Sequence, residues 1–413
     1  MKILWISHIV PYPPKGGLLQ RSHNLLRQIS KRHEVHLVTL NQKKILPTTE
    51  LLDEAITKLK ELCYRINVFD IKSDLSKYNW GTMVVNNYFS KFPYDVNWLS
   101  NDQMMSFMSM LSKNDNYDLV HIDTLGMYPY CVPFSNVPMV LNHHNIESQM
   151  MSKRSELEKN TFKKYYTAKE AIKLQAYEKR ICPRCDMNIV VSDLDSSRMK
   201  NNIKDINISV VPNGVDDKYF TPNTGTDIKR EGLIFAGGMS FYPNREAMLY
   251  FISEIWPLLK TDYPNIPVTI IGRDPPKELL NISLWSNISP KGFVDDVRPY
   301  FDSAKIYICP IFNGGGTRLK ILDALAMAKP LVATEFAVEG LGLIAGKHYL
   351  PANNASEFVN QIKKLLNDDN LCNYMGMAGR KFIEERYSWE IIGNKLNNVY
   401  HETITKYKNT HNR

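Results

Sequence analysis

Residues 305–330 read KIYICPIFNGGGTRLKILDALAMAKP, which joins a short apolar run, three glycines and the start of an apolar helix. The run at 305–309 predicts a buried strand. A glycine turn that opens a helix leaves backbone N–H groups unpaired at the positive end of the helix dipole. Arg318 and Lys320 add cations in the first turn, where they are unfavourable unless an anion joins them. We therefore expect a phosphate or diphosphate site at the end of this strand; the alternative is a flexible turn with a solvated basic face.

The same order of strand, polar or glycine-bearing loop and helix recurs along the chain. The N-terminus gives a strand at 2–9, the loop PYPPKGG at 11–17 and a helical pattern at 19–30. Further buried strands are expected at 35–40, 65–69, 119–122, 138–141, 186–191, 208–211, 232–236, 268–271 and 331–334. This alternation is typical of doubly wound α/β domains, whose ligands bind at the carboxyl ends of the strands.

Length and composition indicate two soluble domains. A chain of 413 residues is too long to fold around one ordinary hydrophobic core. Residues 216–230 are polar and contain Pro222 and Gly225, so they are the expected linker between a first domain at 1–215 and a second that starts at 231. Hydrophobic residues make up 44% of the chain and charged residues 23%, as in soluble globular proteins.

The net charge of +8 favours acidic partners, but it does not choose among nucleotides, nucleic acids and anionic lipids. No nucleic-acid-binding motif supports the second class. No apolar run reaches the length of about 18 residues that spans a membrane. The opening MKILWISHIV predicts a strand rather than a signal peptide, because no small-residue cleavage site follows it, and six scattered cysteines favour the reduced cytoplasm.

Two further groups follow predicted strands. Gly16 and Gly17 lie at the end of the first strand, where they contact a ligand or simply form a tight turn. His143 and His144 follow the strand at 138–141, and a histidine there can position a hydroxyl or carry a proton. The alternative for both histidines is a structural bond to the backbone.

Other patterns carry weaker predictions. Seven aromatic residues crowd into 73–100, and core packing is favoured for them over a role in shaping a substrate site: Tyr78, Trp80, Tyr88, Phe89, Phe92, Tyr94 and Trp98. Residues 147–180 predict a long lysine-rich helix, either solvated or lying against an anionic membrane. Metal binding is disfavoured at Cys182 and Cys185, which lack further ligands, and at Asp193 and Asp195, which suit a helix start.

Five segments in fixed order resemble the donor domain of retaining glycosyltransferases of family 4. They are PNGVDDKYFTP at 212–222, FAGGMSFYPN at 235–244, IIGRDP at 270–275, KGFVDDVRPYF at 291–301 and GGGTRLKILDALAMAKPLVAT at 314–334. The N-terminal segments PYPPKGG, VHID, NHHNIES and VVSD are consistent with the same family. The resemblance implies the GT-B fold, in which two Rossmann-like doubly wound domains face each other across a cleft. It implies a donor domain at 231–388, an acceptor-binding domain at 1–215 and a last helix at 389–413 that crosses back to the first domain.

The resemblance implies a nucleotide sugar as substrate, no cofactor and no required metal. Without a metal, cations and oriented N–H groups must stabilise the departing diphosphate. The residues that match the family's diphosphate site are Gly237, Gly238, Gly316, Thr317, Arg318 and Lys320. Asn244 and Arg245 stand in the loop where the family often has an arginine and a lysine.

The remaining donor contacts are also carried over from the family. Arg273 and Phe293 match the segments that meet the nucleotide base, and Asp323 matches the carboxylate that binds the ribose hydroxyls. The family's other glutamate, eight positions earlier, falls at Gly315, so Glu335 and Glu339 are the candidates to replace it. Gly16 and Gly17 fall on the acceptor side.

The resemblance predicts a cytoplasmic retaining glycosyltransferase that extends a surface glycan or a lipid-linked saccharide, with possible peripheral contact at the inner face of the membrane. Front-face displacement needs no protein nucleophile, and His143 or His144 then binds the sugar or polarises the site. The alternatives are a nucleotide-binding scaffold, motivated by Gly315, and a nucleotide-sugar epimerase. A dehydrogenase is disfavoured because no G-x-G-x-x-G follows a strand. The oligomeric state is not readable from the sequence.

Overall fold

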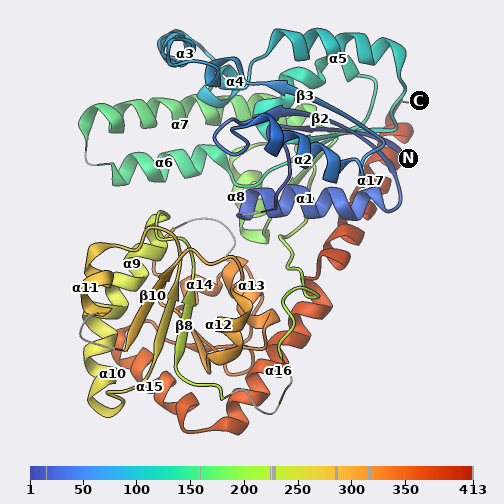
Figure 1. Ribbon diagram of the computed structural model, residues 1–413. Helices are drawn as coiled ribbons and strands as arrows, with labels where there is room; N and C mark the ends of the chain where they lie inside the picture. The colour runs from blue at the N-terminus through green and yellow to red at the C-terminus, as the bar shows by residue number, and fades with distance from the viewer. Residues whose placement is uncertain are drawn as a thin grey trace. The chain divides into compact units, whose positions relative to one another are not determined.

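The computed structural model describes the chain except residues 15, 159, 224, 226–228, 284–286, 315–318 and 412–413. It divides into two compact units (Figure 1). The first consists of Met1–Pro212 and Ile392–Arg413, and the second of Asn213–Ile391. Each unit is an α/β domain built on one parallel sheet.

The first unit has a seven-stranded sheet in the order β3-β2-β1-β4-β5-β6-β7. Its strands are β1 (Lys2–Ser7), β2 (Glu34–Asn41), β3 (Arg65–Asp70), β4 (Leu119–Asp123), β5 (Met139–Asn142), β6 (Met187–Val190) and β7 (Ile208–Val210). Strand β1 pairs in parallel with both β2 and β4, so the strand order reverses beside β1. In open α/β sheets, ligands bind outside the carboxyl ends of the strands at such a reversal.

Helices cover this sheet. They are α1 (Gly17–Ser30), α2 (Thr49–Leu59), α3 (Lys77–Phe89), α4 (Tyr94–Trp98), α5 (Asp102–Asn114), α6 (Glu147–Leu157), α7 (Thr161–Ile181) and α8 (Asp193–Asn202). The prediction of one long helix at 147–180 is wrong, because α6 and α7 are separate helices that lie side by side (Figure 1). The side chain of Asn160 caps α7 by accepting a hydrogen bond from the Lys163 backbone N–H, and asparagine is among the best N-cap residues.

The last helix, α17 (Trp389–His411), packs on the first unit from Ile392 onward. Its Tyr400 hydroxyl lies 2.8 Å from Nδ1 of His121, and both side chains are fully buried. A Cβ atom at Gly393 would lie 2.4 Å from Cβ of Gln28, so only glycine allows α17 to approach α1 this closely.

The second unit repeats this architecture with a six-stranded sheet in the order β10-β9-β8-β11-β12-β13. Its strands are β8 (Leu233–Ala236), β9 (Val268–Ile271), β10 (Ile288–Gly292), β11 (Ile306–Cys309), β12 (Leu331–Ala333) and β13 (Leu350–Pro351). The order reverses beside β8, which pairs with β9 and β11. The sequence did not predict the two edge strands, since β10 contains a proline and a glycine and β13 has two residues.

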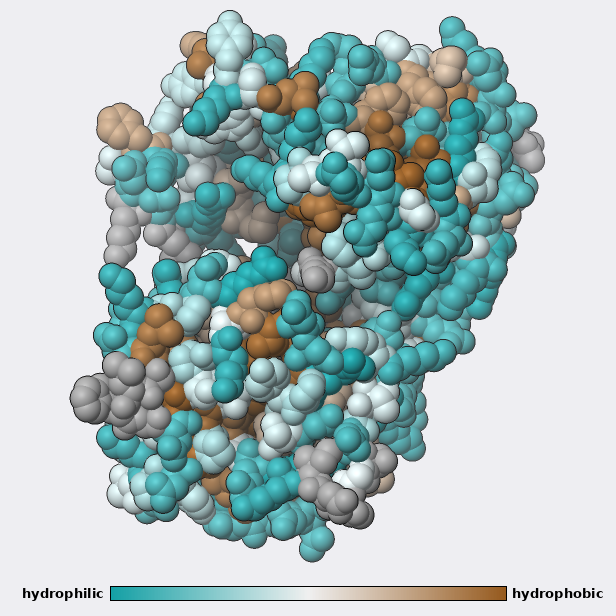
Figure 2. Space-filling view, viewed as in Figure 1, coloured by the Kyte–Doolittle hydropathy of each residue, from teal (hydrophilic) through white to brown (hydrophobic). Residues whose placement is uncertain are grey.

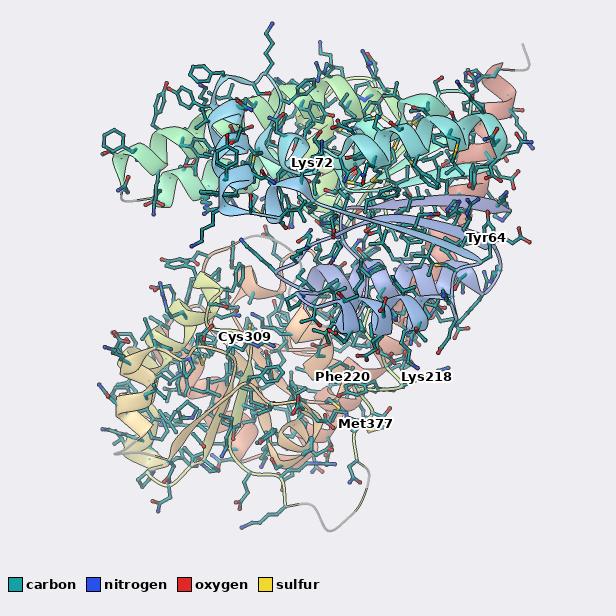
Figure 3. The ribbon with its side chains drawn as sticks, turned by 45° about the horizontal axis from the view of Figure 1, so that its top comes forward. Tyr64, Lys72, Lys218, Phe220, Cys309 and Met377 are labelled. Carbon is teal, nitrogen blue, oxygen red and sulfur yellow. The ribbon has the colours of Figure 1, made fainter. Side chains whose placement is uncertain are left out.

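The helices of the second unit are α9 (Tyr242–Tyr250), α10 (Trp256–Asp262), α11 (Lys277–Ser283), α12 (Arg298–Ser303), α13 (Leu319–Ala326), α14 (Glu335–Val338), α15 (Ala355–Leu366) and α16 (Asp369–Arg386). The expected linker at 216–230 begins as a packed part of this unit. Phe220 (labelled in Figure 3) is buried, and the Arg380 guanidinium donates to the backbone carbonyls of Asp217 and Ala326 at 2.8 and 2.7 Å. The chain therefore passes from the first unit to the second at Pro212, before the polar stretch.

Apolar side chains fill the interior of each unit, and the surface in Figure 2 is largely hydrophilic with separate apolar patches. Core packing is wrong for most of the aromatic segment at 73–100, because five of its seven aromatic residues are exposed: Tyr78, Trp80, Tyr88, Phe89 and Phe92. Trp98 is partly buried and donates its indole N–H to Asp74 Oδ1 at 3.0 Å. Among the described residues, no helix combines the length and apolar character needed to span a membrane.

Candidate active site

In the second unit, three glycine-bearing loops meet at the carboxyl ends of β8, β9 and β10. The N–H of Gly237 donates to the carbonyl of Ile271 at 2.8 Å, and that of Gly272 donates to the carbonyl of Gly292 at 2.9 Å. A Cβ atom on Gly272 would lie 2.0 Å from the carbonyl oxygen of Gly237, so a side chain cannot be accommodated there. The absence of a Cβ atom at Gly272 therefore lets the main chains of these loops pack closely against each other.

Lys320 lies over the first of these loops. It stands at the start of α13, and its ammonium group donates a hydrogen bond to Oδ1 of Asn244 on α9. The Nδ2 group of Asn244 in turn donates to the carbonyl of Gly238 at 2.8 Å, and a Cβ atom at Gly237 would lie 3.2 Å from Nζ of Lys320. Asn244 thus holds a cation against the main chain that follows β8.

Asp323 lies one helical turn after Lys320 on α13 and is partly buried. Burial raises the pKa of its carboxyl group to about 7, although the charge of Lys320 acts in the opposite direction. An anion bound at Lys320 would raise the pKa of Asp323 further, because it adds negative charge nearby. Hydrogen bonds donated by a diol would instead lower this pKa, because they stabilise the carboxylate form.

Arg273 and Phe293 form a pair at the ends of β9 and β10. The guanidinium carbon of Arg273 lies 4.4 Å from the ring centroid of Phe293, within the range of a cation–π contact. Half of the Phe293 surface is exposed, at 51%. A flat, partly solvated pair of this kind suits stacking against a planar ring.

In the first unit, Asp123 ends β4 at the reversal of strand order and is fully buried. Its Oδ1 atom accepts from Asn142 Nδ2 at 2.6 Å and lies 2.9 Å from Nε2 of His144. Its Oδ2 atom accepts from the hydroxyls of Ser22 at 2.6 Å and Ser7 at 3.3 Å. Both carboxylate oxygens of Asp123 are therefore engaged in polar contacts within the protein.

Burial alone would raise the pKa of Asp123, but the neighbouring His144, with His121 and His8, outweighs it and holds that pKa well below its usual range. Because the carboxylate can only accept, Nε2 of His144 carries a hydrogen toward it. Nδ1 of His144 is then the nitrogen that can accept a hydrogen bond from a hydroxyl group.

Arg21 supports this pair from α1 and is itself buried. Its Nη2 and Nε groups donate to Oδ1 of Asn142 at 2.9 and 3.3 Å, and its Nη1 group donates to the carbonyl of Pro212 at 3.0 Å. Asn142 therefore receives hydrogen bonds from Arg21 and donates one to Asp123. The three side chains fix each other's orientation.

A second acidic group adjoins this network. Thr124 follows Asp123 with a φ of 141°, a conformation that only glycine adopts readily, and its hydroxyl donates to Glu147 Oε1 at 2.8 Å. Burial, reinforced by the charge of Asp95, raises the pKa of Glu147 to about 8. Burial likewise raises the pKa of Asp95 to about 6. A strained residue beside two such carboxyl groups is typical of functional sites.

Comparison with known proteins identifies the family. Residues 15–219 match the family described as Glycosyltransferase Family 4, and residues 230–368 match the family described as Glycosyl transferases group 1. The chain belongs to these glycosyltransferases. The first matched region covers most of the first unit and extends to Tyr219 in the second, and the other matched region lies within the second unit.

Proteins similar in sequence or structure align with nearly the whole length of this glycosyltransferase. An uncharacterized 44.6 kDa protein in the cps region of Klebsiella pneumoniae is 23% identical over 400 residues, which are 94% of this chain and 96% of that protein. Sucrose-phosphate synthase of Thermosynechococcus elongatus has a TM-score of 0.69 at 13% identity, over 98% of this chain and 100% of its own. HepE of Anabaena, in complex with UDP, has a TM-score of 0.63 at 14% identity, over 97% and 100%. The fold is GT-B.

Several residues predicted for the glycosyltransferase donor site come together at one sheet edge. Gly237, Gly238, Asn244 and Lys320 are joined by the contacts above, and Asp323 follows on the same helix. Gly315, Gly316, Thr317 and Arg318 lie outside the described residues. The candidates to replace the family's glutamate, which this chain lacks at Gly315, are Glu335 and Glu339 at the two ends of α14. Glu335 accepts a hydrogen bond from the side chain of Asn353 at 3.1 Å.

The structure separates the two histidines. His143 is buried, with Nε2 at 3.1 Å from Asn188 Oδ1, and burial lowers its pKa to about 4. His143 is therefore a neutral core residue, and His144 is the histidine to which we assign the predicted functional role. Gly16 caps the start of α1 with a φ of 98°, and Gly16 and Gly17 are both exposed there.

Sequence reasoning missed most of the network around His144. Asp123, Arg21 and Glu147 lie in the quoted VHID segment, the first helix and NHHNIES, but no pattern in the sequence linked them. The available signal was positional: Asp123 and His144 both end or follow a predicted strand. Parallel strands bring such residues to one edge.

Proposed function

We propose that this chain is a metal-independent retaining glycosyltransferase of polysaccharide biosynthesis, which moves a sugar from a nucleotide-diphosphate donor to a glycan or lipid-linked saccharide. The observation that carries the proposal is Lys320, held by Asn244 over the glycine loop that follows β8. A cation fixed beside open main chain matches the charge that develops on a departing diphosphate. HepE, which shares the fold, was crystallised with UDP, and the Klebsiella relative carries "cps region" in its name; both support this choice of chemistry.

In the proposed reaction, the acceptor hydroxyl attacks from the face that the diphosphate leaves, and the leaving phosphate takes its proton. Lys320 stabilises the leaving group, and Asp323 accepts hydrogen bonds from the ribose. His144, oriented by Asp123, offers Nδ1 to a sugar hydroxyl. We further propose that the enzyme acts in the cytoplasm and that its lysine-rich segment at 147–180 lies near an anionic membrane surface.

The test is a panel of nucleotide sugars incubated with the enzyme, with and without saccharide acceptors, in which release of nucleoside diphosphate is measured. We expect release from at least one donor that an acceptor accelerates and that excess EDTA does not abolish. The anomeric configuration of the product, measured by NMR, should match that of the donor. Tight nucleoside diphosphate binding without release from any donor would favour a scaffold, and interconversion of the donor without transfer would favour an epimerase.

A further inference from the structure

Helix α3 of the first unit presents large aromatic side chains to solvent. The exposed fractions of Tyr78, Trp80 and Phe89 are 82%, 52% and 80%. In the interior of a soluble domain, such side chains bury 150–250 Å² each and supply much of the stabilising energy. A helix that instead turns them outward has a surface that favours an apolar partner.

Polar contacts hold α3 in this orientation. Asn87 is the buried residue of the helix, and its Nδ2 group donates to Tyr166 and to Glu170 of α7, both at 3.0 Å. The ammonium group of Lys173 on α7 donates to the backbone carbonyl of Asn87 at 2.7 Å. The less exposed side of α3, which faces the protein, consists of Gly81, Met83, Val84 and Asn87, so the helix turns its large aromatic side chains outward.

The first turns of α7 extend the aromatic surface. Phe162 and Tyr165 are exposed at 86% and 65%, and the contact between Asn87 and Tyr166 brings this end of α7 beside the end of α3. The ammonium group of Lys169 lies 3.8 Å from the ring centroid of Tyr88, which ties the two helices together. We call this surface of α3 and the start of α7 the aromatic face. In Figure 2, white to brown side chains reach the surface in the region of these helices.

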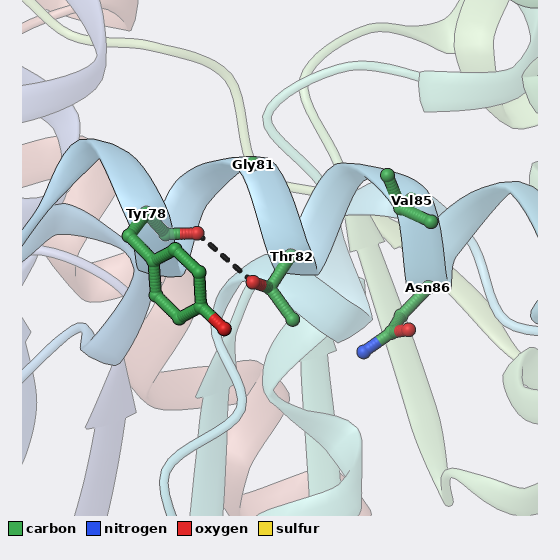
Figure 4. A pocket seen from close by; sticks show the side chains of 5 residues that line it. All are labelled: Tyr78, Gly81, Thr82, Val85 and Asn86. Atoms are coloured by element: carbon green, nitrogen blue, oxygen red, sulfur yellow. Dashed lines mark hydrogen bonds between the residues drawn. The ribbon is translucent and has the colours of Figure 1, made fainter.

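A shallow groove of about 360 Å³ runs along α3. Its lining residues are Tyr78, Gly81, Thr82, Val85 and Asn86 (Figure 4). The Thr82 hydroxyl donates to the carbonyl of Tyr78 at 3.0 Å, and a Cβ atom at Gly81 would meet nothing within 4 Å. The groove therefore presents the Tyr78 ring and the methyl groups of Thr82 and Val85, with the Thr82 hydroxyl already bonded and the Asn86 amide at one end (Figure 4), and this largely apolar lining suits a hydrocarbon chain.

Lysines surround the aromatic face. Residues 72–92 and 161–169 contain one acidic residue, Asp74, and the lysines Lys72, Lys77, Lys91, Lys163, Lys164 and Lys169. Lys72 (labelled in Figure 3) pairs with Asp102, whereas Lys163 and Lys164 stand exposed between Phe162 and Tyr165. Aromatic rings prefer the headgroup level of a bilayer, and clustered lysines are attracted to anionic lipids.

We propose that the aromatic face docks on an anionic lipid bilayer, with the rings of Tyr78, Trp80, Phe89 and Phe162 at headgroup depth and the lysines on lipid phosphates. The interleaving of rings and lysines points to a charged lipid surface rather than to a second copy of the chain, whose same face would bring like charges together. The docking rests on the proposed function in one respect: it brings a lipid-linked acceptor to the unit that binds it.

The experiment is sedimentation of the full-length protein with vesicles of phosphatidylcholine alone or mixed with phosphatidylglycerol. The test variant carries Tyr78→Ser, Trp80→Ser and Phe89→Ser together. The control carries Leu258→Ser, Ile344→Ser and Met377→Ser, which remove similarly exposed apolar side chains from the second unit. Circular dichroism checks that both variants are folded.

We expect wild type and control to bind the anionic vesicles and the test variant to bind at least tenfold more weakly. The double variant Lys163→Glu with Lys164→Glu should lose the preference for phosphatidylglycerol. Equal vesicle binding by wild type and test variant would overturn the proposal. It would also be overturned if wild type bound no vesicles and ultracentrifugation showed an oligomer that the test variant loses. Nucleoside diphosphate release from the panel of nucleotide sugars is measured in parallel without vesicles, so a failure of the proposed transferase activity is distinguished from a failure of docking.

Discussion

The carboxyl edges of the two sheets present different chemical groups to a ligand. In the first unit, the edge carries a buried set of side chains in which Asp123, Asn142 and His144 bond to one another. In the second unit, the edge consists of glycine loops, with Lys320 and Asn244 placed over them. Fixed side chains suit the directional hydrogen bonds of a sugar hydroxyl, whereas open main chain and a cation suit a diphosphate.

The comparison predicts that the first edge depends on its side chains for stability as well as for function. The largest effect is expected for Asp123→Ala, which leaves His144, Asn142 and Ser22 without their shared acceptor. Breaking a buried, hydrogen-bonded charge network costs about 3–5 kcal/mol, and urea unfolding should show a loss of this size.

The matched control is Asp115→Ala, which removes partly exposed ion pairs with Lys2 and Arg65 and should cost about 1 kcal/mol. Equal losses for the two variants would contradict the distinction between a buried network and a surface pair. Because the pKa of Asp123 is lowered in the folded state, its stabilising contribution is present above about pH 4 and is lost as the pH falls further.

The second prediction concerns the proton on Glu147. Its pKa in the folded state is about 8, whereas that of an unfolded glutamate is about 4.3. Between these values the folded chain keeps a proton that the unfolded chain releases, so wild type loses stability as the pH rises. Relative to wild type, Glu147→Gln should gain more than about 1.4 kcal/mol between pH 5 and pH 8, since one pKa unit corresponds to that free energy.

Thermal or urea unfolding at several pH values measures this difference. The control variant is Glu61→Gln, an exposed glutamate of the same unit, whose stability should follow that of wild type at every pH. Parallel curves for Glu147→Gln and wild type would show that Glu147 titrates normally.

The third prediction addresses the second edge, where binding rather than stability should change. Lys320→Ala should weaken nucleoside diphosphate binding by at least tenfold, which is about 1.4 kcal/mol, because the cation over the glycine loop is lost. Calorimetry measures the affinity, and Lys260→Ala, an exposed lysine of α10, serves as control. An unchanged affinity for Lys320→Ala would remove the basis of the proposed donor site.

The smallest effect is expected at the pair of Arg273 and Phe293. Phe293→Ala removes the exposed ring on which Arg273 lies and should weaken nucleotide binding by about 0.5–1 kcal/mol. The same calorimetric titration compares it with Tyr374→Ala on α16, a ring of similar exposure at 54%. A larger loss for the second variant would place the base elsewhere.

Most of the fold was predictable because buried parallel strands are short apolar runs followed by polar loops. The strand expected at 268–271 agrees with β9 to the residue. The strand expected at 35–40 is one residue shorter than β2 at each end, and the one expected at 65–69 is one residue shorter than β3 at its end. Edge strand β10 was missed, because a strand with one neighbour tolerates proline and loses the apolar signal. The long helix at 147–180 was wrong because one good capping residue, Asn160, can start a new helix within a continuous helical pattern.

The candidate sites were predictable to different degrees. The donor residues stand in segments whose pattern resembles that of the family, so the sequence predicts Gly237, Asn244 and Lys320 for one site although Lys320 is 76 residues from Asn244. The network around His144 draws on α1, β4 and β5, which are far apart in the chain. Sequence spacing alone therefore did not distinguish His144 from the buried His143.

The sequence by itself determined the alternation of strands and helices, the division into two α/β units and the basic character of the chain, because these follow from local periodicity and composition. Only the tertiary structure decided which histidine meets Asp123, which carboxyl groups are buried and that α3 turns its aromatic residues outward. These features depend on contacts between distant segments. Asn87 illustrates the reason: its hydrogen bonds to α7 fix the orientation of α3, and helical periodicity contains no information about them.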